Sequence, residues 1–170
     1  VQNALREYWA PVYAHHEIDR EAALKLFNIY HKNNSHLFAF SNLALPDSDF
    51  YQEYIPRLRD SAPGINGIPY SAYKANVPLS AQVFSIHTKY MSTNVQPEGL
   101  SAFNEQLIWF APKGISAEDD FAVYREPSQL RTIFGSNTDS KIIAGAVASV
   151  LTPATLAVTP PIQRGFCRGR

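Results

Sequence analysis

The sequence predicts an α+β fold in which helices predominate and one antiparallel β-hairpin interrupts them. Most of the chain spaces its apolar side chains three or four residues apart, the period of a helix that buries one face. A short run at 107–111 instead carries consecutive β-branched, aromatic and other apolar residues, which is typical of a strand, and 130–134 is a further strand candidate. Of the 170 residues, 45% are apolar and 18% are charged, a balance that supports a packed core.

The N-terminal third of the chain is expected to form three helices. The first should stop at Pro11, and the second should begin after Asp19, a suitable N-cap, and run through Tyr30. In the third, Asp47 or Ser48 can cap the first turn. The predicted buried faces are Ala4, Leu5, Tyr8 and Trp9; then Ala23, Leu26, Phe27 and Tyr30; then Phe50, Tyr54, Ile55 and Leu58.

A dense turn follows at 61–69, where two glycines lie three residues apart and each is near a proline. Pro63, Gly64 and Gly67 predict a compact structural turn with a positive φ angle at one or both glycines. Beyond it we expect a short helix at 70–75 and a longer helix opened by Pro78. The predicted buried face of the longer helix is Leu79, Val83, Ile86 and Tyr90.

The hairpin is expected between residues 105 and 135. Its first strand is 107–111, and 121–124 and 130–134 are candidates for the returning strand. These bounds predict a connecting loop of about eight to ten residues, a length typical of functional loops. A final helix, capped by Thr138 or Asp139, should end at Pro153. Its predicted buried side chains are Ile142, Ile143, Ala146, Val147 and Val150.

Composition restricts the class of protein. Fifteen basic and fifteen acidic residues exclude a globally basic nucleic-acid-binding surface. A single cysteine, Cys167, excludes an intramolecular disulfide and a multi-cysteine zinc site, and it favours an intracellular location, nuclear or cytoplasmic. The most apolar stretch, 144–158, is interrupted by Pro153 and is expected to be too short to span a membrane. We expect no secretory leader, and the turn-like end at Arg170 suggests a fragment of a longer chain.

Neither a metal site nor a catalytic residue is predicted. The five histidines have no Asp, Glu or Cys at ligand spacing. The adjacent carboxylates Asp119 and Asp120 could in principle bind magnesium, but they follow Gly114 in a predicted loop and are expected to form a solvated hairpin tip.

Basic residues cluster locally in the second half of the chain. Lys113 and Arg125 each stand beside a predicted strand, so strand pairing can bring both cations to one side, an arrangement that suits a nucleotide triphosphate. The alternative is two ordinary exposed cations on a hairpin. The last seven residues hold three arginines and no acid. Such a cluster is suited to binding phosphate; the alternative interpretation is a solvated basic tail.

Five segments resemble, in the same chain order, motifs of the reverse transcriptases of non-LTR retrotransposons and group II introns. They are 61–70 (SAPGINGIPY), 107–114 (LIWFAPKG), 124–130 (YREPSQL), 141–143 (KII) and 161–170 (PIQRGFCRGR). The first segment is similar to the signature APGPDGIPY, with Asn66 where the family has aspartate. Glu126 is an insertion relative to the third motif. The resemblance implies that 61–170 is the helix-rich fingers subdomain of a right-hand polymerase, truncated before the palm, and that 1–60 is a variable helical lead-in.

The resemblance also assigns roles to residues. Lys113 and Arg125 would bind the triphosphate of the incoming nucleotide. The template or nucleic-acid contacts would be Gln163, Arg164, Gly165, Phe166, Arg168 and Arg170. The full-length parent would be an RNA-directed DNA polymerase that uses Mg²⁺, an RNA template, a DNA primer and dNTPs.

The palm aspartates follow these motifs in the family. The fragment alone is therefore expected to bind no cofactor, to be catalytically inactive and to have no membrane partner. The alternative function is a repurposed or decayed module that binds RNA or a protein.

Overall fold

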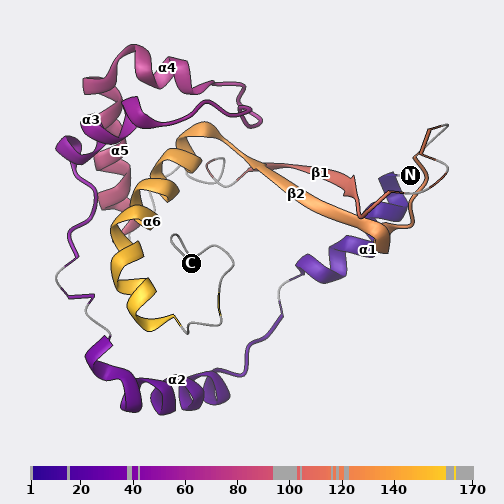
Figure 1. The fold of residues 1–170 in the computed structure, drawn as a ribbon, viewed down its shortest axis with the longest axis horizontal. Coiled ribbons are helices and arrows are strands. Elements are labelled where there is room, and N and C mark those ends of the chain that lie inside the picture. Colours follow the sequence, from indigo (N-terminus) through magenta and orange to yellow (C-terminus); the bar gives the residue numbers. More distant parts are fainter. Residues whose placement is uncertain are drawn as a thin grey trace.

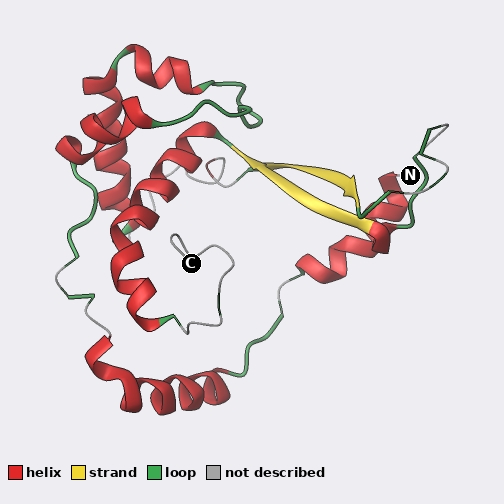
Figure 2. Ribbon diagram, in the orientation of Figure 1, coloured by secondary structure: helices red, strands yellow, loops and turns green. Residues whose placement is uncertain are grey.

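The structure is a computed structural model that describes residues 2–14, 16–37, 40–41, 43–93, 103, 105–115, 117, 119–120, 123–159 and 163. These residues form six α-helices and one two-stranded antiparallel sheet (Figures 1 and 2). The predicted α+β class with a single hairpin is therefore confirmed.

The core lies where helices α3 (Ser48–Arg57), α4 (Tyr70–Ala75), α5 (Val77–Met91) and α6 (Thr138–Val158) meet. Figure 1 shows α3, α4 and α5 gathered on one side of α6. The buried cluster consists of Tyr51, Ile55, Tyr70, Ala81, Phe84, Ile142, Ile143 and Ala146. These side chains come from both sides of the hairpin in sequence, so the core joins the two halves of the chain.

A hydrogen-bonded chain crosses this core between α3 and α5. The Thr88 hydroxyl donates to the carbonyl oxygen of Phe84 at 2.9 Å, which leaves the Tyr51 hydroxyl to donate to Thr88 Oγ1 at 2.7 Å. Burial raises the pKa of Tyr51 above its ordinary value, and the hydrogen bond to Thr88 opposes this only in part.

The predicted buried face of α5 is wrong. Leu79, Val83, Ile86 and Tyr90 are exposed, whereas Ala81, Phe84, Ser85 and Thr88 are buried. Small side chains at the buried positions let α3 approach closely, and Phe84 fills the remaining space against the ring of Tyr51. Because apolar residues occur all round this helix, periodicity alone selected the wrong face.

Helix α2 (Arg20–Asn34) starts where it was expected but does not bury its predicted face. Asp19 Oδ1 accepts a hydrogen bond from the Ala22 N–H at 2.9 Å, which confirms the N-cap. The side chains of the predicted face are nevertheless exposed: Ala23, Leu26, Phe27 and Tyr30. In Figure 1 the helix lies apart from the core, and its Tyr30 hydroxyl reaches the Val158 carbonyl oxygen at the end of α6 at 2.6 Å.

The remaining helix ends differ from the sequence prediction at three places. One is the start of α6, where Asn137 and not Thr138 or Asp139 is the N-cap, without a side-chain hydrogen bond. Asp47 caps α3 as predicted, since its Oδ1 accepts from the Phe50 N–H at 2.8 Å. Helix α1 (Gln2–Tyr13) continues past Pro11, and α6 continues past Pro153, so neither proline ends its helix. Around Pro153 the hydroxyl of Thr152 donates to the Ala148 carbonyl, an additional side-chain bond in the turn where proline cannot donate.

Helix α6 is also longer than its apolar stretch suggested. It has 21 residues and, among the described helices, it alone is long and apolar enough to cross a membrane by length and composition. The length expected from 144–158 was therefore too short. Of its apolar window 22% is buried, which includes Ile142, Ile143 and Ala146 in the core.

The hairpin pairs β1 (Gln106–Pro112) with β2 (Leu130–Ser136). The register runs from Gln106 opposite Ser136 to Pro112 opposite Leu130. The first strand is thus confirmed. The strand considered at 121–124 is wrong for its described part, 123–124, because 130–136 occupies the whole length of β1. The connection consequently spans 113–129, longer than predicted, and ends in a short 3-10 helix, η3 (Pro127–Gln129).

One face of the hairpin packs against helix α1. The Trp9 ring lies 6.4 Å from the Phe110 ring, and the Tyr13 ring meets Phe134 edge-on at 5.4 Å. The opposite face of the hairpin carries Leu107, Trp109 and Ile133, all exposed among the described residues. We call this opposite face the uncovered hairpin face.

Candidate nucleotide-binding site

The glycine turn packs against the junction between β2 and α6. Asn137 immediately follows β2, and its Oδ1 accepts a hydrogen bond from the Asn66 N–H at 3.2 Å. The next residue, Thr138, donates from its hydroxyl to the Ile68 carbonyl oxygen at 2.7 Å. The glycine turn therefore lies close to the end of the hairpin.

The two glycines are needed for different physical reasons. Gly67 has a φ angle of +67°, and its N–H donates to the Gly64 carbonyl oxygen at 3.1 Å, so the predicted positive φ is confirmed there. Gly64 is buried, and a Cβ atom built on it would lie 2.4 Å from Asn137 Oδ1. Pro63 is half-buried beside it.

Two lysines hold the chain that enters the turn. Lys141, in the first turns of α6, donates from Nζ to the Ala62 carbonyl oxygen at 2.6 Å and lies 5.9 Å from the centre of the Tyr70 ring. Lys74, in α4, donates to the Leu58 carbonyl oxygen at 2.6 Å and pairs with Asp60 at 3.0 Å. The segments at 61–70 and 141–143 therefore contact each other directly.

Lys113 stands at the first position after β1. Its backbone N–H donates to the Gln129 carbonyl oxygen at 2.8 Å, which extends the pairing of the strands by one step. Its Nζ donates to the Ser128 carbonyl oxygen at 2.8 Å, and the side chain is exposed. The ammonium group thus lies beside the segment that follows Arg125 in the same connection.

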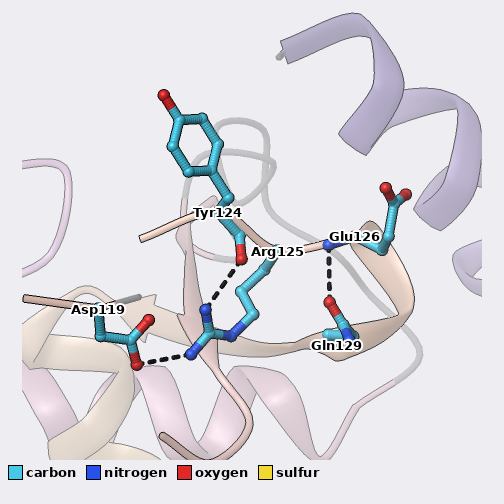
Figure 3. A network of polar contacts seen from close by, with 5 residues as sticks. All are labelled: Asp119, Tyr124, Arg125, Glu126 and Gln129. Atoms are coloured by element: carbon cyan, nitrogen blue, oxygen red, sulfur yellow. Dashed lines mark hydrogen bonds and ion pairs between the residues drawn. The ribbon is translucent and has the colours of Figure 1, made fainter. Parts of the chain in front are cut away.

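Arg125 is held by a carboxylate from earlier in the connection (Figure 3). Its Nη2 lies 2.7 Å from Asp119 Oδ2, and its Nη1 donates to the Tyr124 carbonyl oxygen at 2.9 Å. The Arg125 side chain is 8% exposed and that of Asp119 is 22% exposed. The hydrogen bond to Asp119 raises the pKa of the Arg125 guanidinium, which burial alone would lower.

Asp119 is the residue of this site that sequence reasoning missed. It was assigned to a solvated hairpin tip, and for Asp119 that assignment is wrong; its neighbour Asp120 is exposed as expected. The available signal was a carboxylate six residues before an arginine within one loop. Such spacing is compatible with an ion pair but does not by itself predict one.

Glu126 does not disturb the strands. Its N–H donates to Gln129 Oε1 at 3.0 Å, and it precedes η3, so the extra residue is absorbed before β2 begins at Leu130 (Figure 3). Arg125 accordingly lies in the connection and not beside a strand. Its position relative to Lys113 across the sheet stays a prediction.

The proposed template contacts fall mostly outside the described residues. Gln163 is described and exposed, whereas Arg164, Gly165, Phe166, Arg168 and Arg170 lie outside the described part of the chain. Within the described part, no group of three or more His, Cys, Asp or Glu side chains is placed to hold a metal ion. Comparison of the chain with protein-family models, curated proteins and solved structures finds no match.

Proposed function

We propose that this chain is the fingers part of a retroelement-type reverse transcriptase and contributes nucleotide-triphosphate and template contacts to RNA-templated DNA synthesis. The observation that carries it is the docking of the glycine turn on the β2–α6 junction through Asn66 and Asn137. This docking brings the segments 61–70 and 141–143, far apart in sequence, into one structural unit with the hairpin. Separate motifs that act on one ligand must lie in such a unit, because their side chains have to reach the same place.

The connection 113–129 supplies the chemistry for a polyphosphate. Lys113 offers an exposed ammonium group, and the guanidinium of Arg125 has five N–H donors, of which the contacts to Asp119 and Tyr124 use two. Both residues are carried by a connection whose ends are fixed by strand pairing, and a fixed support limits the entropy lost when an anion binds.

No metal-dependent step is assigned to the described residues, since none of their carboxylates gathers into a group that fits a two-ion centre. In the family that the sequence resembles, Mg²⁺ would be held by palm aspartates. The role proposed for this chain is to position nucleotide and template.

Titration of inorganic triphosphate into the 170-residue chain tests the nucleotide contact. Lys113→Ala should weaken binding about tenfold at low salt, because a charge-assisted hydrogen bond to phosphate is lost. The matched control is Lys25→Ala, which removes an exposed lysine from α2 and should leave binding unchanged. Equal binding by Lys113→Ala and the parent chain would refute the nucleotide contact.

A non-catalytic RNA-binding module is the second candidate, and the uncovered hairpin face favours it. Trp109 is 45% exposed, and Arg131 projects from the same face on the paired strand. An indole can stack on a base while an arginine contacts phosphate. If this candidate is correct, Trp109→Ala weakens binding of single-stranded RNA and Lys113→Ala leaves triphosphate binding unaffected.

A further inference from the structure

The guanidinium of Arg125 already has an anionic partner in its own chain. The contact to Asp119 is short, 2.7 Å, and both side chains are largely withdrawn from water. An ion pair in such surroundings is weakly screened, so breaking it without replacement carries a large cost. A phosphate group that binds Arg125 therefore competes with the Asp119 carboxylate for the guanidinium.

This exchange discriminates between anions by the number of contacts that they offer. A single phosphate forms one ion pair with Arg125 while it breaks the ion pair of Arg125 with Asp119, so little free energy is gained. A triphosphate has further oxygens that can contact a second cation at the same time. Lys113 is the candidate for this second cation, because its Nζ donates to the Ser128 carbonyl oxygen in the same connection, three residues beyond Arg125.

We infer that Asp119 is a specificity-determining counter-ion. Its carboxylate outcompetes a monophosphate for Arg125 and is displaced by a polyphosphate that also contacts Lys113. This role rests on the proposed function, because it concerns the same triphosphate site. The carboxylate would hold Arg125 in place while the site is empty. It would also raise the concentration of anion that is needed to occupy the site.

Removal of the Asp119 charge tests the inference. Inorganic triphosphate and orthophosphate are titrated separately into the parent chain, Asp119→Asn and Asp120→Asn. Asp119→Asn keeps the shape and an acceptor oxygen, and it should increase affinity for both anions, about fivefold for triphosphate and more for orthophosphate, so that the ratio between them narrows. Asp120→Asn removes the same charge from the exposed neighbouring position and should change either affinity by less than about twofold.

The outcome separates the inference from the function on which it rests. If Lys113→Ala and Arg125→Ala both weaken triphosphate binding while Asp119→Asn binds both anions as the parent does, the counter-ion role is wrong and the nucleotide site stands. If none of the three variants changes triphosphate binding, the nucleotide site itself is wrong. Asp119→Ser, which also removes the charge, replaces Asp119→Asn if circular dichroism shows that the amide variant does not fold.

Discussion

Gly64 lies so close to Asn137 that no other residue fits at this position. A Cβ atom on Gly64 would lie 2.6 Å from both the Cα and the backbone N of Asn137, well inside normal contact distance. Backbone atoms at the start of α6 cannot move aside as the end of a flexible side chain can. The contact therefore determines how the turn sits on the β2–α6 junction.

Gly64→Ala should destabilise the protein by about 2–3 kcal/mol, the cost of overpacking a closely packed site, as measured by urea denaturation. The matched variant is Gly67→Ala, where no atom lies within 4 Å of the added Cβ and only the positive φ angle opposes substitution. That variant should cost about 1 kcal/mol. An equal decrease in the free energy of unfolding for the two variants would show that the packing of Gly64 on Asn137 contributes nothing to stability.

Tyr51 should make the stability of the core sensitive to alkaline pH. Its folded-state pKa lies above the ordinary value of 10.0, mainly because of burial. Above pH 10 the unfolded chain therefore loses the phenolic proton first, so the free energy of unfolding falls as pH rises toward the folded-state pKa. The contribution is fully present below pH 10.

Tyr51→Phe should reduce this alkaline loss and, at neutral pH, cost about 1 kcal/mol for the hydrogen bond to Thr88. Thr88 keeps its bond to the Phe84 carbonyl, so no buried donor is left unpaired there. Urea denaturation at pH 7 and at pH 10.5 measures both effects. The exposed Tyr8 provides the control, and Tyr8→Phe should follow the parent at both pH values.

Trp109 reports on the uncovered hairpin face. A Cβ atom on Gly135 would lie 2.1 Å from Cζ3 of the Trp109 ring, so the ring rests on the glycine. Gly135→Ala should push the indole off the strand into water and shift its fluorescence emission to longer wavelength. The only other tryptophan, Trp9, is replaced by Phe in both samples so that the signal is from one residue. An unchanged spectrum would contradict the contact.

The C-terminal arginines should give weak, sequence-independent RNA binding. If Arg164, Arg168 and Arg170 neutralise about three phosphates of a single strand, the logarithm of affinity should fall with the logarithm of salt concentration at a slope of about −2. Replacing all three by alanine should flatten the slope. Titrations across salt concentrations that give the same slope for both proteins would exclude the tail as an RNA contact.

Much of the local structure could be predicted because it depends on neighbours in sequence. Asp19 and Asp47 cap their helices with their own side chains, Gly67 adopts the positive φ of its turn, and β1 follows its β-branched and aromatic run. The prediction that Pro11 and Pro153 end their helices was wrong. Pro153 lacks an N–H group, yet α6 continues to Val158, and Ala154, directly after the proline, is buried.

The sequence selected the residue types of the candidate site but not their arrangement. Lys113 and Arg125 were proposed from charge and from the resemblance of their segments to reverse transcriptase motifs, and their role in binding a nucleotide stays a prediction. The ion pair of Arg125 with Asp119 was not found, since it depends on the path of the connection between them. That path was itself misjudged when 121–124 was considered as a strand.

The sequence alone determined the caps of α2 and α3, the existence of the hairpin and the positive φ angle of Gly67, because each depends on backbone geometry within a few residues. The predicted cap of α6 was wrong, since Asn137 and not Thr138 or Asp139 is its N-cap. Only the tertiary structure decided which faces are buried. Ala81, Ser85 and Thr88 of α5 are inside and Leu79, Val83 and Ile86 are outside, since close approach of α3 favours small side chains over large ones. It also decided that Asn137 receives the glycine turn across 71 residues of sequence, because a hydrogen bond at that separation exists only once the strands have paired and α6 has packed.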